Sequence, residues 1–322
     1  MRKVLVTGAA GFIGARTAEV LLEKGWKVLG VDNLNDYYDV RLKKHRLTGL
    51  KKFSRFKFIK VDIEDLPTLK SIFRKFRPQA VINLAARAGV RYSLENPFVY
   101  MSTNAVGTLN ILEACKELSI RKIVTASTSA LYAGQKMPFK ETSAANDPIS
   151  PYAASKKSAE LLCNTYHRLY GLDITVLRYF TVYGPAGRPD MSPFRFIRWI
   201  AEGRPVQVFG SGKQSRDFTY VDDIAAGTVK ALRLKGFQVV NLGGNKPCKL
   251  SHFIALIEKK LGKKARINYL PTHKTDVNAT WADISKARRL LGWKPSIGLG
   301  QGLSRTIEWY RQNRSWASKI KL

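Results

Sequence analysis

Tyr152 and Lys156 are the residues of this sequence best suited to acid–base chemistry. Their i, i+4 spacing places both side chains on one face of a helix. A tyrosine with a pKa of about 10 is a poor base at neutral pH. A neighbouring ammonium group stabilises the phenolate, so we expect the pKa of Tyr152 to fall. The phenolate could then accept a proton from an alcohol while hydride leaves its carbon. Because Tyr-x-x-x-Lys alone is common, this interpretation depends on the surrounding motifs.

Hydroxyl groups cluster at Ser127, Thr128 and Ser129, directly after the apolar run Lys122–Ala126. The run is typical of a buried strand, and the carboxyl ends of parallel strands face the ligand crevice. Hydroxyls there can bridge a reacting oxygen and the tyrosine. We therefore predict that these three residues belong to the catalytic group.

A glycine-rich turn follows the first apolar run of the chain and opens a helical segment. In that context Gly8 permits a tight turn, Gly11 lets the backbone approach a pyrophosphate, and Gly14 allows close packing of helix on strand. The helix N-terminus, with Phe12 and Ile13, presents unpaired N–H groups to the anion. The turn therefore predicts a dinucleotide site.

Asp32 ends the second predicted strand. A carboxylate there can accept hydrogen bonds from both hydroxyls of the adenosine ribose and would repel a 2′-phosphate, which favours NAD over NADP. Further cofactor contacts are expected at the ends of the neighbouring strands. Together with Tyr152 and Lys156, which would hold the nicotinamide ribose, they are Asn33, Asp62, Ile63, Ala85, Ala86 and Tyr179.

Strand and helix patterns alternate along the first half of the chain. This alternation predicts an α/β fold with a doubly wound parallel (Rossmann) sheet and helices on both faces. The expected strands are 3–6, 26–32, 56–61, 80–84, 122–126 and 174–177, and the expected helices are 15–24, 66–76, 103–117 and 152–170.

The regular alternation of strand and helix patterns ends after Tyr179, where Gly184, Pro185 and Gly187 indicate loops. We predict an NAD-binding domain over 1–179, with returning segments at about 218–243. A smaller α/β substrate-binding lobe is expected over 180–217 and 244–322.

The amino-acid composition limits the classes of protein to which this chain could belong. The chain has 322 residues, 45% of them hydrophobic, so it can bury a core of about two domains. Three widely spaced cysteines and four scattered histidines favour neither a disulfide framework nor a metal site. Without a signal peptide pattern or an apolar run of about 20 residues, the sequence favours a cytoplasmic protein that does not enter a membrane.

The net charge of +31 leaves two interpretations open. A strongly basic chain attracts nucleotides, nucleic acid and anionic lipid alike. The charges are spread along the sequence without a basic tail, as on an enzyme with a solvated basic surface. A polyanion-binding role is the alternative.

These motifs together resemble the extended short-chain dehydrogenase/reductase superfamily, in its nucleotide-sugar epimerase branch. The resemblance covers nearly the whole chain and is closest to the UDP-glucuronate 4-epimerases. The strings that carry it are Thr7–Gly14 (TGAAGFIG), Asp32–Asp39 (DNLNDYYD), Ala88–Ser93 (AGVRYS), Thr181–Pro185 (TVYGP), Gly187–Met191 (GRPDM), Ser215–Asp223 (SRDFTYVDD) and Thr280–Asp283 (TWAD).

The resemblance implies an NAD-dependent epimerase. NAD would oxidise C4 of the sugar to a ketone, the keto sugar would turn over in the pocket, and hydride would return to its other face. Tyr152 would be the acid/base, and Lys156 would lower its pKa. Thr128 would be the family's catalytic hydroxyl. The substrate-binding residues would be Arg91, Ser129, Thr181, Arg188, Arg216 and Asp276.

Their implied roles differ. Arg188 and Arg216 would bind the UDP pyrophosphate, and Asp276 the uridine ribose. Thr181 stands where glucose/galactose epimerases commonly carry Asn, which favours the glucuronate branch. Arg188, like Arg87 and Arg91, could also meet a carboxylate.

Ser129 and Ala130 follow Thr128. Related dehydratases carry an Asp-Glu pair at these places, and UDP-glucuronate decarboxylases carry Glu at the second. The absence of both carboxylates excludes these reactions. Two other residues depart from the family pattern, since Ala133 and Thr275 replace usual glycines, and Thr275 weakens the assignment of Asp276.

Two alternatives remain. One is a UDP-glucose/UDP-galactose 4-epimerase or related UDP-sugar epimerase, which an assay with both substrates would distinguish. The other is an RNA-binding protein on the same fold. The intact catalytic set disfavours RNA binding, but binding that persists near about 0.2 M salt would support it.

The resemblance also implies a homodimer. In the family, helices such as 103–117 and 152–170 pair across a four-helix interface. Leu112, Leu161, Leu162 and Leu169 would contribute to it, although ordinary core packing explains them equally well.

Overall fold

Seven parallel strands form the main sheet of this computed structural model, which describes residues 2–272 and 275–321. Their order is β10-β6-β5-β4-β1-β2-β3, so the direction of winding reverses between β1 and β4. This confirms the doubly wound fold, whose ligands bind at that switch point. The strands are β1 Lys3–Thr7, β2 Lys27–Asp32, β3 Phe56–Lys60, β4 Ala80–Asn83, β5 Lys122–Thr128, β6 Asp173–Tyr179 and β10 Phe237–Leu242.

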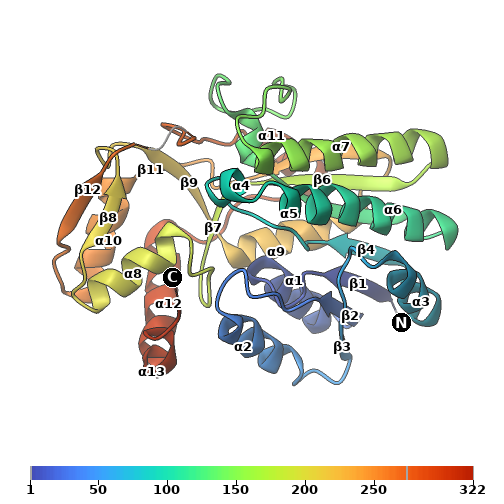
Figure 1. Ribbon diagram of the computed structural model, residues 1–322, viewed down its shortest axis with the longest axis horizontal. Helices are drawn as coiled ribbons and strands as arrows, with labels where there is room; N and C mark the ends of the chain where they lie inside the picture. The colour runs from blue at the N-terminus through green and yellow to red at the C-terminus, as the bar shows by residue number, and fades with distance from the viewer. Residues whose placement is uncertain (1, 273–274, 322) are drawn as a thin grey trace.

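Helices cover both faces of this sheet (Figure 1). Along β1, Val4 and Val6 join the apolar cluster of one face and Leu5 joins that of the other, as alternation in a strand requires. The first cluster includes residues of α1 Phe12–Glu23, α2 Val40–Leu50, α9 Val221–Lys230 and α11 Ser285–Leu291. The second includes residues of α3 Leu66–Phe76, α6 Gly107–Glu117 and α7 Pro151–Tyr170.

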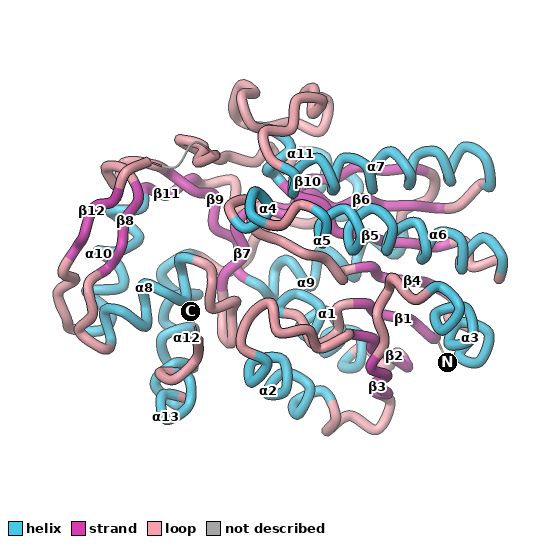
Figure 2. Tube along the Cα trace, viewed as in Figure 1, coloured by secondary structure: helices cyan, strands magenta, loops and turns pink. Residues whose placement is uncertain are grey.

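A smaller α/β lobe lies at one end of the molecule, beyond β7 (Figure 2). It contains a three-stranded sheet in the order β11-β9-β7 and the pair β12-β8. Its core is aromatic, with Phe218 and Phe253 stacked at 4.3 Å between ring centroids. The elements are β7 Thr181–Tyr183, β8 Val206–Phe209, β9 Ser215–Tyr220, β11 Pro247–Lys249, β12 Ile267–Leu270, α8 Ser192–Ala201, α10 Leu250–Leu261, α12 Leu299–Gln312 and α13 Arg314–Ala317.

Several elements differ from the sequence-based expectation. Helix α2 was not predicted. The segment expected as one helix from residue 103 is a π-helical turn, Met101–Val106, followed by α6. The remaining short elements are α4 Tyr92–Glu95, α5 Phe98–Tyr100 and the 3₁₀ turns Ser129–Tyr132 and Ala231–Arg233.

The segments around the predicted domain boundaries divide between the two lobes. Strand β9 pairs with β7 and β11, whereas β10 joins the main sheet beside β6. Ala287 and Trp293, which lie in the segment assigned to the smaller lobe, pack into the core of the main sheet. The division of the chain into domains stays a prediction.

The three cysteines, Cys115, Cys163 and Cys248, are free and buried. Among residues 2–272 and 275–321, no three His, Cys, Asp or Glu side chains gather as a metal site would require. No helix within these same ranges has the length and apolar character needed to span a membrane.

Candidate active site

One cavity of about 420 Å³ lies along the carboxyl ends of the main strands and reaches the smaller lobe. Of the predicted site residues, only Arg91 is missing from its lining. The predicted residues that line it are Gly8, Gly11, Phe12, Ile13, Gly14, Asp32, Asn33, Asp62, Ile63, Ala85, Ala86, Ser127, Thr128, Ser129, Tyr152, Lys156, Tyr179, Thr181, Arg188, Arg216 and Asp276.

The glycine turn leaves no room for side chains. Gly8 has a φ of +64°, and a Cβ added there would meet the amide nitrogen of Ala85 at 2.7 Å. A Cβ on Gly14 would lie 2.0 Å from the carbonyl oxygen of Gly8. Helix α1 begins after Gly11 without a side-chain cap, so the N–H groups of its first turn are available to an anion. This cradle fits the pyrophosphate of a dinucleotide.

Asp32 is fixed at the end of β2 by three donors. Its Oδ2 accepts from the Ala10 amide at 3.2 Å, and its Oδ1 accepts from the Leu34 amide at 2.8 Å. The ammonium of Lys43, on α2, lies 3.5 Å from Oδ1. Both side chains are buried and both line the cavity. Sequence reasoning missed Lys43, because α2 carries few apolar residues.

The adenosine end of the predicted site is completed by Asn33 and Asp62. The Asn33 amide donates to the Asp62 carboxylate at 2.6 Å, which joins the ends of β2 and β3. On the other side of the turn, the Thr7 hydroxyl accepts from the amides of Leu84 and Ala85, each at 3.1 Å. The ends of β2 and β3, and those of β1 and β4, are therefore held together in pairs.

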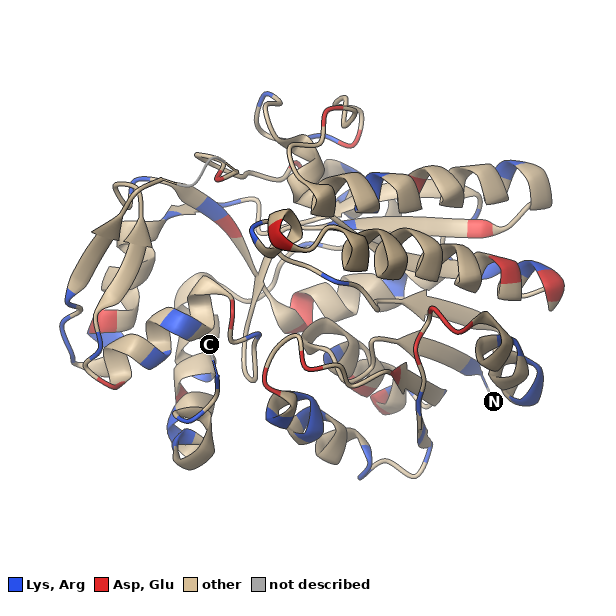
Figure 3. Cartoon of the chain, viewed as in Figure 1, with Lys and Arg blue, Asp and Glu red and all other residues tan. Residues whose placement is uncertain are grey.

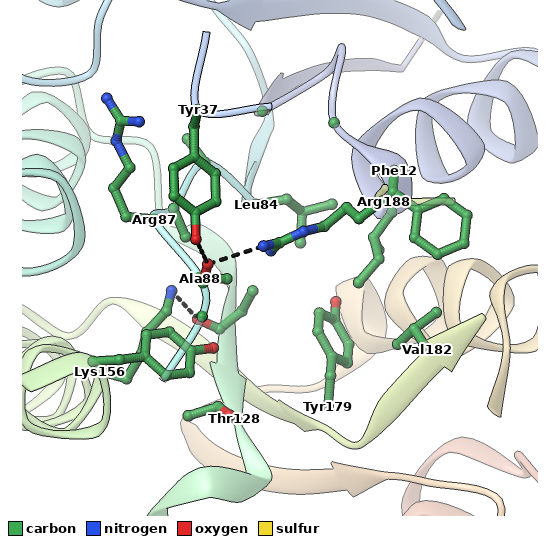
Figure 4. A pocket seen from close by; sticks show the side chains of 18 of the residues that line it. Phe12, Tyr37, Leu84, Arg87, Ala88, Thr128, Lys156, Tyr179, Val182 and Arg188 are labelled. Atoms are coloured by element: carbon green, nitrogen blue, oxygen red, sulfur yellow. Dashed lines mark hydrogen bonds between the residues drawn. The ribbon is translucent and has the colours of Figure 1, made fainter. Parts of the chain in front are cut away.

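At the other end of the cavity, α7 brings Tyr152 and Lys156 beside the end of β5. Figure 4 shows Lys156 and Thr128 in this part of the cavity. Lys156 is 4% exposed, and its Nζ donates to the carbonyl oxygen of Ala126 at 3.0 Å. Burial lowers the pKa of Lys156 to about 8. The ammonium is thus anchored to β5.

Burial raises the pKa of Tyr152, whereas a hydrogen bond with Thr128 and the charge of Arg188 act in the opposite direction. Lys156 itself is directed to the carbonyl oxygen of Ala126, and its effect on the pKa of Tyr152 stays a prediction. Thr128 is therefore the hydroxyl that contacts Tyr152, and Arg188 is the cation whose field reaches it.

Of the three clustered hydroxyls, those of Ser127 and Thr128 have different partners: Thr128 accepts from the Ala130 amide at 3.1 Å. Ser127 donates to Glu160 at 2.6 Å, and Glu160 pairs with Arg178 at 2.6 Å. Its hydroxyl is thus held by a buried ion pair behind the cavity. Ser129 and Ala130 line the cavity without adding a carboxylate.

The side chain of Arg188 reaches into the same cavity as Thr128 and Lys156 and points to Ala88 (Figure 4). Its Nη2 donates to the carbonyl oxygen of Ala88 at 2.9 Å, and its guanidinium pairs with Asp190 at 2.5 Å. The hydroxyl of Tyr37, which sequence reasoning did not select, donates to the same carbonyl oxygen at 2.7 Å. Arg188 is thus held rigidly.

Asp276 and Arg216 line the part of the cavity nearer the smaller lobe. Asp276 pairs with Arg91 at 2.7 Å, and the Arg91 guanidinium lies 3.7 Å from the centre of the Phe209 ring. Arg91 therefore contacts Asp276 from outside the cavity lining, and its direct contact with substrate stays a prediction. Burial lowers the pKa of Arg216, and the charge of Asp276 raises it.

Comparison with known families gives one match over most of the chain. The family model described as GDP-mannose 4,6 dehydratase matches residues 5–306. The chain is 57% identical over 319 residues to the UDP-glucuronate 4-epimerase of Thermodesulfobacterium geofontis, covering 99% of each protein. It is 41% identical over 332 residues to the probable UDP-glucuronate 4-epimerase of Rhizobium meliloti, covering 97% of each.

Solved structures agree with these relatives. The UDP-glucuronic acid 4-epimerase of Bacillus cereus, crystallised with UDP-glucuronic acid and NAD, superposes with a TM-score of 0.91 at 39% identity, over 97% of this chain and 99% of that one. A UDP-glucose 4-epimerase from Thermotoga maritima, crystallised with UDP-glucose, gives 0.90 at 33% identity over the same shares. The backbone alone therefore does not distinguish the two sugars.

Proposed function

We propose a function from the premise that the chain belongs to the GDP-mannose 4,6-dehydratase family of extended short-chain dehydrogenases/reductases. The protein is a UDP-glucuronate 4-epimerase, which interconverts UDP-glucuronate and UDP-galacturonate through a transient 4-keto sugar. The observation that carries this proposal is the placement of Arg188 in the same cavity as Tyr152 and Thr128, beside a strand end free of catalytic carboxylates.

The residues that line the cavity fit NAD. The Gly8–Gly14 turn and the first turn of α1 would hold the pyrophosphate, and Asp32 the adenosine ribose. Asp62 and Ile63 would flank the adenine, and Lys156 would hold the nicotinamide ribose. Bound NAD supplies the hydride acceptor that makes oxidation of an alcohol possible and returns the hydride afterwards.

Tyr152 moves the proton of the sugar's C4 hydroxyl. As a phenolate it accepts that proton during oxidation, and as a phenol it gives the proton back to the ketone oxygen during reduction. Thr128 holds the tyrosine oxygen by a hydrogen bond, and Lys156 holds the backbone of β5 beside them. Arg188 stabilises the phenolate, since its positive charge acts on Tyr152.

Arg188 is also the cation best placed to receive the substrate carboxylate at the catalytic end. Its Nε and Nη2 groups are held by Asp190 and Ala88, which fixes the plane of the guanidinium and leaves Nη1 to donate to a carboxylate. Thr181 lines the cavity nearby on β7 and adds a hydroxyl. Arg216 would then serve the pyrophosphate of UDP, and Asp276 the uridine ribose.

The lack of a carboxylate at Ser129 and Ala130 suits this substrate. A C4-keto uronate is a β-keto acid and tends to lose CO₂. A nearby general acid or base would assist that loss, and the described lining offers none at these two positions. The 4-keto intermediate therefore persists long enough to rotate in the pocket and be reduced on its other face.

The experiment is an NMR assay of the purified protein with UDP-glucuronate and, separately, with UDP-glucose. Formation of UDP-galacturonate without added NAD supports the proposal. Turnover of UDP-glucose alone would contradict the assigned sugar in favour of the glucose/galactose alternative. The Tyr152→Phe variant should lose about 100-fold or more in kcat while keeping its bound nucleotide; full activity in that variant would contradict the assigned acid/base.

The protein is proposed to act as a cytoplasmic homodimer. Five apolar side chains are exposed on α5, the π-helical turn and α7, three elements that contact one another: Phe98, Met101, Val106, Leu161 and Leu169. Leu112, by contrast, is fully buried in the core. Free buried cysteines suit a reducing compartment. Light scattering should give twice the mass of the chain, and Leu161→Glu should give the monomer mass; a monomeric wild-type protein would contradict the dimer.

A further inference from the structure

A second cavity, of about 540 Å³, lies at the opposite end of the main sheet from the candidate active site. Arg2, Gln79 and Lys122 line it where β1, β4 and β5 begin. The N-terminus marks this end in Figure 1, remote from the smaller lobe. Helix α9 and the 3₁₀ turn after it form another wall. None of its lining residues lines the active-site cavity, so it is a separate site.

Five cationic side chains line this cavity: Arg2, Lys24, Lys122, Lys230 and Arg233. Its lining contains no Asp or Glu. None of the five takes part in any salt bridge found within residues 2–272 and 275–321. The other basic residues are spread over both lobes (Figure 3), so such convergence in one hollow is not a simple consequence of composition.

Two of these cations are held in place. The Nζ of Lys122 donates to the carbonyl oxygen of Leu234 at 2.6 Å and to the hydroxyl of Thr175 at 3.1 Å. The Nζ of Lys230 donates to the carbonyl oxygen of Gly292 at 2.7 Å. Each ammonium has three N–H groups, so both keep donors for a ligand.

The electrostatic setting favours an anion. Burial lowers the pKa of Lys122 to about 8, and the charge of Asp173 only partly offsets this effect. The neighbouring Glu23 already contacts Arg16 at 3.3 Å. An anion in the cavity would stabilise the charged form of Lys122, since opposite charges at short range have that effect.

We propose that this cavity binds a nucleoside di- or triphosphate. Two arginines and three lysines match several phosphate groups, because guanidinium forks and ammonium groups both bind phosphate oxygens. Trp26 and Leu232 supply an apolar wall for a base or a sugar, and the Arg2 guanidinium lies 5.6 Å from the centre of the Trp26 ring. The volume falls within the range of about 300–1,000 Å³ for small-molecule sites.

The test is a calorimetric titration with ATP of the protein saturated with NAD and UDP, which keeps ATP out of the active site. The variant Lys24→Glu/Arg233→Glu reverses two exposed charges of the cavity. The control Lys259→Glu/Lys264→Glu reverses two exposed charges in the smaller lobe, with the same change in net charge. Circular dichroism checks that all three proteins are folded.

We expect ATP to bind the wild-type protein and the control with similar affinity, and the cavity variant to bind at least about tenfold more weakly. Equal weakening in both variants would show that general charge attracts the nucleotide and would overturn the proposal, as would the absence of binding. A single-stranded RNA of about 12 nucleotides that binds more tightly than ATP, and is lost in the cavity variant, would overturn it in favour of nucleic acid.

Discussion

Lys43 and Asp32 form a buried ion pair inside the cofactor cavity, with 3.5 Å between Nζ and Oδ1. The side chains are each 6% exposed. The lysine reaches the carboxylate from α2, across the turn that follows β2. The carboxylate that we predict to bind the adenosine ribose is thus paired with a buried cation, and each neutralises the charge of the other.

The first prediction concerns this pair. In Asp32→Ser the repulsion of a 2′-phosphate is removed and the Lys43 ammonium becomes free to attract it. The ratio of NADP affinity to NAD affinity should rise by about tenfold or more. Calorimetry with both nucleotides measures the ratio. The exposed Asp36→Ser, with the same change of charge, should leave it unchanged; an unchanged ratio in Asp32→Ser would show that Asp32 does not select the cofactor.

The second prediction concerns the glycine turn. Gly8→Ala forces a side chain into φ +64° and against the Ala85 amide, so it should cost roughly 1–3 kcal/mol of stability and release the bound nucleotide. Gly49→Ala is the control, because α2 has open space there and alanine favours a helix by about 0.5–1 kcal/mol. Urea unfolding and nucleotide content measure both. Retention of a full complement of NAD in Gly8→Ala would contradict the assigned cradle.

The third prediction follows from Lys156. Its folded-state pKa of about 8 lies below the ordinary value of 10.5. Between these two pH values the unfolded chain binds the proton more readily than the folded one, so stability rises as pH increases from 8 to 10.5. Below pH 8, the lowered pKa of Lys156 destabilises the folded protein by the full amount, which is about 3 kcal/mol.

This destabilisation should be absent from Lys156→Met. Over that pH window, the free energy of unfolding of the wild-type protein should therefore rise by about 3 kcal/mol more than that of the variant. Urea unfolding of both proteins at matched cofactor content measures the difference. Parallel pH profiles for the two proteins would mean that Lys156 is not the group whose pKa is lowered.

The fourth prediction concerns Ala130, which lines the cavity two residues after Thr128. Ala130→Glu places a carboxylate where decarboxylases of the family carry one. The fraction of substrate converted to a UDP-pentose with release of CO₂ should rise. NMR of the products gives the ratio of pentose to hexuronate, with Ala130→Gln as the uncharged control. The same ratio in the wild-type and Glu proteins would contradict the role given to this position.

Much of the fold could be predicted because local signals and tertiary structure agree there. Helix α3 has the predicted bounds, and strands β1, β4 and β6 are buried on both faces of the main sheet along nearly their whole length. Helix α2 could not be predicted. Val40–Leu50 is rich in cations, and two of these, Lys43 and Arg46, are buried through contacts with distant parts of the chain.

In the candidate site, too, the sequence predicted some residues but not the partners that hold them. Motifs located the glycine turn, Asp32, Thr128 and Tyr152, since each lies at a strand end or helix start that the alternation also predicts. The partners of these residues were not visible. The bond from Lys156 to Ala126, the use of Ser127 by Glu160 and the placement of Arg91 behind Asp276 depend on how separate elements meet.

The most direct test of the proposed chemistry follows the hydrogen at C4 of the sugar. UDP-glucuronate deuterated at C4 is converted in ordinary water, and the UDP-galacturonate formed is analysed by NMR and mass spectrometry. If the same hydrogen leaves and returns within the closed site, the product keeps its deuterium at C4. Loss of that deuterium to the solvent during turnover would contradict the mechanism.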